Sequence, residues 1–201
     1  MIHVDSPIPE PDDFETDCRQ KGNDWLARNP GASTSKYPSY WREFSAQLER
    51  GFTGRCGYQA IIMPEGTVDH FISKKTDQFL TYEWSNYRYC GSAFNSAKQN
   101  HDDQVPDPFE VKDDWFEVIL PSCQLIATDQ LPASMEAKAE IIIDTPGLLN
   151  SEKARRNRLN RYREYLDGNI DLDSLKYYAP QVGAAVQTYL DDGVSPPRIV
   201  S

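Results

Sequence analysis

TVDHFISKK, residues 67–75, places a histidine behind an aspartate and ahead of two lysines, within a segment whose Thr, Val and Phe residues favour β-structure. The residues before it, YQAIIM (58–63) and the turn PEG (64–66), predict that TVDHF is the second strand of a β-hairpin. His70 is one of three histidines in the chain. Two interpretations follow: His70 is a packed residue of an ordinary strand, or it is part of an active site.

A helix is predicted to follow this hairpin. After the polar loop at 72–84, the segment SNYRYCGSAFNSAKQN (85–100) has the pattern of a helix, with Ser85 as its N-cap. Residues 56–100 therefore have the predicted order strand, strand, helix.

The segments on both sides of this unit are predicted to be mainly helical. Residues 1–15 are expected to be extended and poorly ordered. Trp41, Phe44 and Leu48 fall on one face of a predicted helix. The other expected elements are helices at 14–28, 38–50, 132–143, 151–166 and 179–190, and strands at 115–120 and 124–128.

The expected fold class is α+β. A chain of 201 residues is long enough for one domain with a real core. We expect the strand–strand–helix core at 56–100 to be embedded in a mostly helical single domain. An N-terminal helical lead-in at 1–55 would precede it, and a C-terminal β-hairpin with a helical extension at 101–201 would follow it.

Composition limits the classes of function. The chain has no run of eighteen apolar residues, and its acidic, proline-rich beginning does not have the pattern of a signal peptide, so a cytoplasmic protein without a membrane span is expected. The formal net charge of −10 opposes binding to polyanions. Any function on nucleic acid therefore requires a local basic patch or a basic partner.

The order of polar residues in 56–100 suggests a specific chemistry. Asp69 and His70 come first, Asn86 follows the loop, and Asn95 is followed three residues later by Lys98. Hydrolysis of a phosphodiester needs a base that deprotonates water and a cation that stabilises negative charge, and histidine titrates near neutral pH. Asp and Asn offer the oxygen ligands that Mg²⁺ prefers.

These segments, VDHF, YEWSNYRY and FNSAK, resemble the motif of the HNH endonucleases, whose core is a ββα-metal unit. The resemblance implies that His70 is the general base, that Asp69 and Asn95 bind Mg²⁺ or Mn²⁺, and that Asn86 supports catalysis by bracing the loop that orients the histidine. It further implies that lysines hold phosphate groups, namely Lys74, Lys75 and Lys98.

The cysteines depart from the pattern of many HNH proteins, which bind a structural zinc through two CxxC pairs. Cys56 has Gln59 where a second cysteine would stand, and Cys90 is followed by Phe94 directly before the motif asparagine. Two thiols do not make a tetrahedral zinc site. We therefore expect no zinc knuckles, and apolar packing of Phe94 and Tyr58 in their place.

The flanks extend the resemblance to a subgroup of HNH proteins that includes the nuclease subunit of Septu-type anti-phage defence systems, which works beside an ATPase. It implies a nucleic acid substrate, DNA more readily than an RNA such as tRNA, and a hetero-oligomer with an ATPase subunit. The alternative is an interaction subunit with weak or conditional catalysis. Helix 151–166 leaves two readings open for Arg158 and Arg161: a solvated face, or a patch that binds phosphates.

Overall fold

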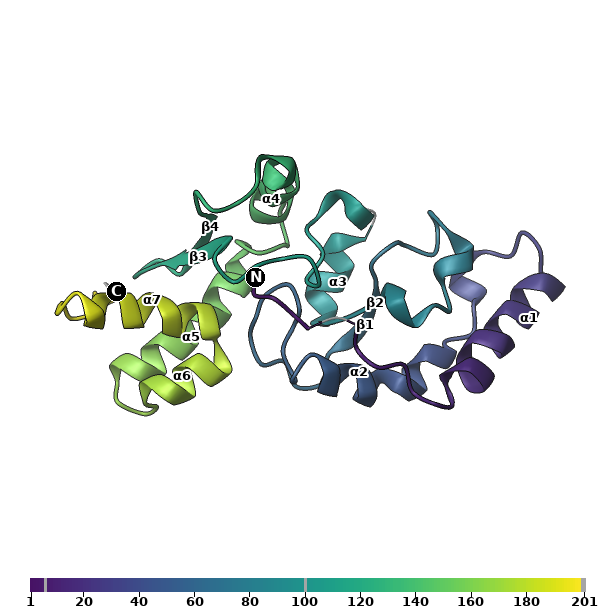
Figure 1. Cartoon of the computed structure of the whole chain (residues 1–201), viewed down its shortest axis with the longest axis horizontal. Helices are drawn as coiled ribbons and strands as arrows, with labels where there is room; N and C mark the ends of the chain where they lie inside the picture. Colours follow the sequence, from purple (N-terminus) through teal and green to yellow (C-terminus); the bar gives the residue numbers. More distant parts are fainter. Residues whose placement is uncertain (6, 100, 200–201) are drawn as a thin grey trace.

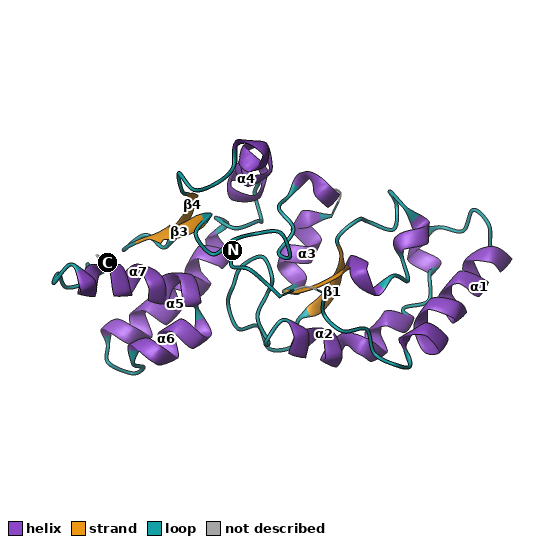
Figure 2. Cartoon of the chain, viewed as in Figure 1, coloured by secondary structure: helices purple, strands orange, loops and turns teal. Residues whose placement is uncertain are grey.

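Helices and two small antiparallel sheets make up the computed structural model, which describes residues 1–5, 7–99 and 101–199 (Figures 1 and 2). The fold class is thus α+β. The strands are β1 (Thr67–His70), β2 (Tyr87–Cys90), β3 (Phe116–Ile119) and β4 (Gln124–Ala127). The α-helices are α1 (Lys21–Arg28), α2 (Ser45–Gly51), α3 (Ser92–Lys98), α4 (Glu136–Asp144), α5 (Glu152–Leu166), α6 (Leu172–Tyr178) and α7 (Pro180–Asp191).

Short helical turns extend several of these helices. A π-helical turn, Glu15–Gln20, leads directly into α1, and a 3₁₀ turn, Tyr40–Phe44, leads into α2. The remaining 3₁₀ turns are Thr34–Lys36, Gln78–Leu80, Trp84–Asn86, Asp102–Gln104 and Ala133–Met135. No helix in the described part of the chain combines the length and apolarity needed to cross a membrane.

The first sheet pairs β1 with β2, so that Asp69 lies opposite Arg88 and His70 opposite Tyr87. The prediction of a helix over 85–100 was therefore wrong in its first half, because YRYC forms a strand and the helix begins only at Ser92. The aromatic residues at alternate positions of β2, Tyr87 and Tyr89, pack against the rings of Phe14 and Phe52, as the period of two in a strand requires. α2 and α3 lie on different sides of this sheet (Figure 1).

The predicted strand at 58–63 was also wrong. The segment forms turns, with one isolated bridge between Arg55 and Ile62. Ala60 has a left-handed φ of 53°, which reverses the chain direction and lets its amide reach the carbonyl of Cys56 at 2.8 Å. The strand partner of TVDHF is therefore supplied by Tyr87–Cys90, across a long loop.

An aromatic cluster joins the N-terminal helices to β2. Trp41, Phe44 and Leu48 are all buried, which confirms the predicted face. The ring of Phe14 packs edge-on against Phe44 and Tyr87, at 5.0 and 5.8 Å between centroids. Burial of large aromatic side chains is the main source of stability in such a layer, because each removes a large apolar area from water.

The N-terminal segment is extended, but the expectation that it is poorly ordered was wrong. Met1 is fully buried. The amide of Val4 donates to the carbonyl of Pro108 at 3.1 Å, and the indole of Trp84 donates to the carbonyl of Ile8 at 2.9 Å. The segment thus contacts both the β1–β2 unit and the residues that follow α3.

The C-terminal part follows the sequence closely. The predicted strands and the helices that became α4, α5 and α7 are confirmed. Ser151 caps α5 as predicted, because its hydroxyl accepts a hydrogen bond from the amide of Ala154. The short helix α6 was not predicted, although Asp171 provides an N-cap by accepting from the amide of Ser174 at 2.8 Å.

Candidate active site

A cavity of about 580 Å³ lies along the edge of β1. Within the described residues β1 pairs only with β2, so its other edge carries no strand. Because successive side chains of a strand point to opposite faces, Asp69 and His70 enter this cavity from the two faces of the sheet. The side chains that complete its walls come from three elements: Trp41, Arg42 and Ser45 near α2, Ser73 and Lys74 in the loop, and Asn95 and Gln99 at α3.

His70 is held in one tautomer. Its Nε2 lies 3.0 Å from the carbonyl oxygen of Thr81, which can only accept, so Nε2 carries the proton and Nδ1 is left as an acceptor. Burial, together with the nearby charge of Lys74, lowers the pKa of His70 to about 3, so the ring is neutral near pH 7. The ring of Trp41 packs perpendicular to it, at 4.7 Å between centroids.

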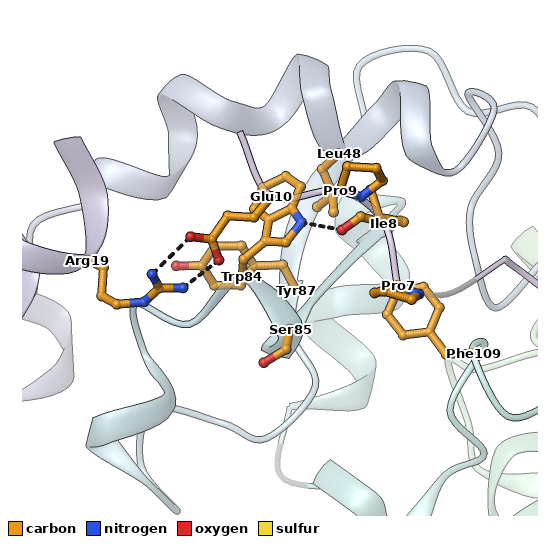
Figure 3. Close-up of a pocket in the computed structure, with 10 residues that line it drawn as sticks. All are labelled: Pro7, Ile8, Pro9, Glu10, Arg19, Leu48, Trp84, Ser85, Tyr87 and Phe109. Carbon is orange, nitrogen blue, oxygen red and sulfur yellow. Dashed lines mark hydrogen bonds and ion pairs between the residues drawn. The ribbon is translucent and has the colours of Figure 1, made fainter. Parts of the chain in front are cut away.

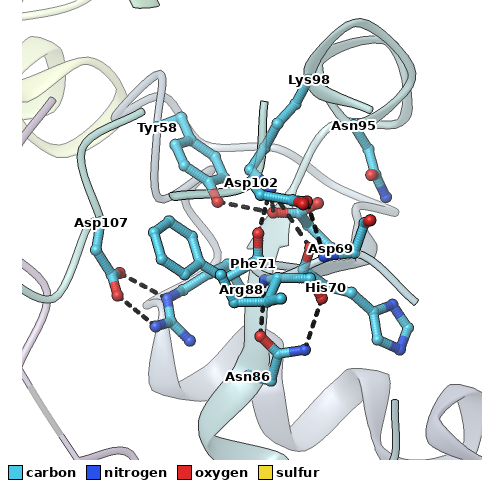
Figure 4. A network of polar contacts seen from close by, with 12 residues as sticks. Tyr58, Asp69, His70, Phe71, Asn86, Arg88, Asn95, Lys98, Asp102 and Asp107 are labelled. Atoms are coloured by element: carbon cyan, nitrogen blue, oxygen red, sulfur yellow. Dashed lines mark hydrogen bonds and ion pairs between the residues drawn. The ribbon is translucent and has the colours of Figure 1, made fainter. Parts of the chain in front are cut away.

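Asp69 is buried and held by one of its two oxygens. The hydroxyl of Tyr58 donates to Oδ2 at 2.7 Å, and the Lys98 ammonium lies 3.3 Å from the same oxygen (Figure 4). Burial raises the pKa of this carboxyl, and the Lys98 charge acts in the opposite direction. Oδ1 has no hydrogen-bond partner among residues 1–5, 7–99 and 101–199.

Asn95 is oriented by β1 itself. Its Nδ2 donates to the carbonyl of Val68 at 3.1 Å, which fixes the amide plane and leaves Oδ1 as a free acceptor within the described chain. The three groups predicted for catalysis and metal binding, His70, Asp69 and Asn95, therefore line one cavity (Figure 4).

The donor set fits a hard cation that retains water. No three His, Cys, Asp or Glu side chains converge anywhere in the described residues. An ion beside β1 would therefore depend on the carboxylate of Asp69 and the amide oxygen of Asn95, with water completing its shell. Mg²⁺ is bound in this manner, because it dehydrates reluctantly and takes few protein ligands.

Asn86 braces the loop in the way the sequence predicts. Its Oδ1 accepts from the amide of Ile72 at 2.8 Å, while its Nδ2 donates to the carbonyls of Ile72 and Leu80. One buried side chain thus joins the start of the loop between β1 and β2, at Ile72, to its middle, at Leu80. Asn86 does not line the cavity, so its contribution is to position the loop that carries Thr81.

The predicted phosphate-binding lysines differ in position. Lys74 lines the cavity, with its Nζ 4.6 Å from the centre of the Trp41 ring. Lys75 is exposed and lies outside the cavity lining. The expectation for Lys98 needs correction, because its side chain is fully buried and its Nζ donates to the carbonyls of Phe71 and His70. Lys98 therefore stabilises β1 and Asp69 from within the core, and its ammonium is not accessible to a phosphate.

Both readings of Arg158, a solvated face and a patch that binds phosphates, were also wrong. Its side chain is 1% exposed, and it donates to the carbonyls of Cys123 and Leu149 and to Oδ1 of Asn150. Burial lowers the pKa of this guanidinium to about 10, so it is still charged at neutral pH. Arg161, on the next turn, is half-buried and pairs with Glu164.

Replacement of Arg158 by methionine is expected to lower the free energy of unfolding by about 2 kcal/mol, because the buried carbonyls of Cys123 and Leu149 lose a charged donor. Urea unfolding followed by circular dichroism measures this change. Arg156, an exposed residue of the same helix, is the matched control, and its replacement by methionine should cost less than about 0.5 kcal/mol. Equal effects for the two variants would contradict the structural role of Arg158.

Three contributors to the site were not predicted as such. Trp41 was expected only in the core, Tyr58 only as packing, and Arg42 had no predicted role. The expected packing of Tyr58 on Phe94 is confirmed, with stacked rings at 4.6 Å between centroids. The YWREF segment (40–44) has Trp41 and Arg42 side by side. Nothing in the sequence indicated that Trp41 packs on His70 or that Arg42 lines the same cavity.

Comparison with known proteins adds no assignment: no protein-family model matches the chain, and no curated protein sequence matches it.

Proposed function

We propose that this protein is a metal-dependent endonuclease of the HNH type, which hydrolyses phosphodiester bonds at the edge of β1. One observation carries the proposal. Asp69, His70 and Asn95 line the same cavity as the cationic Lys74, and each has one acceptor atom without a partner in the described chain. This combination of a neutral base, two oxygen ligands and a cation is the set that phosphodiester hydrolysis requires.

In the proposed reaction, Nδ1 of His70 takes a proton from water while the water oxygen attacks the phosphorus. The bond from phosphorus to the leaving oxygen breaks, and that oxygen is protonated by solvent. Asp69 and Asn95 would hold Mg²⁺ or Mn²⁺, which would supply the positive charge that stabilises the reacting phosphate. The carbonyl of Thr81 favours the positive imidazolium that forms, because it accepts a hydrogen bond from Nε2–H.

We further propose DNA as the substrate, with RNA as the alternative, and a bacterial anti-phage defence complex with an ATPase partner in the cytoplasm as the setting. The motif resemblance supports the setting. The charge supports the need for a partner, because a chain with 31 acidic and 21 basic residues repels polyanions over most of its surface. A partner that holds the nucleic acid would bring it to β1.

Removal of divalent metal is expected to abolish cleavage. Purified protein, alone and co-expressed with the product of the neighbouring open reading frame, is incubated with plasmid, single-stranded DNA and total RNA. Mg²⁺ or Mn²⁺ should permit cutting, excess EDTA should stop it, and added Mn²⁺ should restore it. Undegraded DNA beside cut RNA would change the substrate to RNA, and cleavage that persists in EDTA would overturn the metal-dependent mechanism.

Calorimetry separates the nuclease from an interaction subunit, the candidate that the net charge of −10 favours. Mn²⁺ binding to the wild-type protein that is lost in both Asp69→Asn and Asn95→Ala supports the nuclease. A chain that binds no divalent metal at these residues, yet forms a stable complex with its partner, would be an interaction subunit.

A further inference from the structure

Arg42 is a cation without an acidic partner at the mouth of the cavity. It belongs to the 3₁₀ turn Tyr40–Phe44, its side chain is exposed, and it lines the same cavity as His70. No carboxylate pairs with it in the described part of the chain. Carboxylates do pair with four other arginines, namely Arg19, Arg28, Arg88 and Arg161. What sets Arg42 apart from the remaining unpaired arginines is its place in the lining of the cavity that holds His70.

Lys74 lies near Arg42 and is equally unpaired. Within residues 1–5, 7–99 and 101–199 it has no ion-pair partner, and its ammonium instead contacts the face of Trp41. Burial lowers the pKa of Lys74, and the positive charge of Arg42 lowers it further. Two like charges held together at a cavity mouth repel each other, so an anion placed between them would relieve this repulsion.

The charges are distributed unevenly between the cavity walls. Arg42 and Lys74 lie on the side of the sheet that His70 faces, together with Trp41. The wall formed by α3 carries the uncharged amides of Asn95 and Gln99, on the side of Asp69. α2 and α3 lie on different sides of β1–β2 (Figure 1). The cavity therefore has a cationic side and an oxygen-donor side.

We propose that Arg42, with Lys74, binds the non-bridging oxygens of a nucleic acid phosphate in this cavity. The inference rests on the proposed nuclease function and adds a substrate-binding residue from outside the strand–strand–helix unit. A guanidinium presents a planar fork of donors that matches two phosphate oxygens, whereas an ammonium acts as a point charge. Such contacts read the backbone and carry no base specificity, which predicts cleavage with little sequence preference at this position.

The test compares Arg42→Ala and Arg42→Lys with Arg50→Ala. Arg50 is an exposed residue of α2 outside the cavity, so it controls for the loss of one surface charge. Binding of a fluorescein-labelled DNA duplex is measured by anisotropy over a range of salt concentrations, on the complete complex carrying His70→Ala to prevent cutting. Steady-state cleavage is measured with His70 intact, and thermal melting checks the fold.

Arg42→Ala should weaken binding and kcat/KM about 10- to 100-fold, the loss expected for one charge-assisted contact. The slope of log K against log salt should fall by about 0.9, one phosphate contact. Arg42→Lys should recover the salt slope but not the full affinity, and Arg50→Ala should remain within about twofold of wild type.

Equal losses in Arg42→Ala and Arg50→Ala, or an unchanged salt slope in Arg42→Ala, would overturn the role of Arg42. A complex that binds no duplex or single strand would overturn it as well. These results are distinct from failure of the nuclease proposal, which would appear as undiminished cleavage by His70→Ala. Binding and cleavage are separate readouts, so each proposal can fail alone.

Discussion

Replacement of His70 by alanine is expected to lower the rate of metal-dependent cleavage about 10²- to 10⁴-fold, the usual contribution of a positioned general base. The expectation follows from the hydrogen bond of Nε2 to the carbonyl of Thr81, which leaves Nδ1 as the acceptor of a ring that lines the cavity. Single-turnover cleavage of a labelled duplex in Mg²⁺ measures the chemical step directly. Binding of the duplex should change little, because the neutral imidazole contributes no charge to it.

Two further variants make this result specific. His3 bonds the carbonyl of Val111 and takes no part in the cavity, so His3→Ala should cleave at the wild-type rate. His70→Gln retains a side chain against Trp41 and guards against a simple packing defect. Cleavage by both His70 variants within about threefold of wild type would exclude His70 as the base.

Replacement of Lys98 by methionine is expected to lower the free energy of unfolding by about 3–5 kcal/mol, the cost of removing one partner from a buried ion pair. The variant leaves the carboxyl of Asp69 with Tyr58 as its remaining side-chain donor in the described chain. It also removes the donor from the carbonyls of Phe71 and His70. Urea unfolding in the absence of divalent metal measures the change.

A double-mutant cycle identifies the cause. Asp69→Asn combined with Lys98→Met should be less destabilised than the sum of the single variants, because no charge is then buried without a partner. Lys75 is exposed, so Lys75→Met should change the unfolding free energy by less than about 0.5 kcal/mol. An additive cycle would mean that the Lys98–Asp69 pair contributes no coupling.

Much of the local structure could be predicted because short-range signals determine it. The face of Trp41, Phe44 and Leu48, the cap at Ser151 and the paired strands around Pro121 all follow from periodicity or capping chemistry. The bracing role of Asn86 also follows the motif, and its bonds to Ile72 and Leu80 are the ones such a role requires.

What could not be predicted depends on contacts between distant segments. The sequence favours a hairpin between residues 58–63 and β1 over the pairing of β1 with β2. The left-handed turn that prevents this hairpin is at Ala60, and the sequence has no glycine there to indicate it. Arg158 donates to the carbonyls of Cys123 and Leu149, which lie 35 and 9 positions before it and outside its helix, so no helical projection reveals them. Arg42 reaches the cavity only because α2 packs beside β1.

The strands that carry the candidate site are also supported by residues far from them in the sequence. Pro7, Pro9 and Leu48 line a mainly apolar pocket together with Trp84, which precedes β2, and Tyr87, its first residue (Figure 3). An isolated two-stranded sheet is marginal in water, so these contacts hold β1 and β2 in place. The strand–strand–helix unit is accordingly not expected to work when it is separated from the rest of the chain. A peptide of residues 56–100 would lack Trp41, which packs against His70. A graft onto another scaffold would have to include the turn Tyr40–Phe44 and α2.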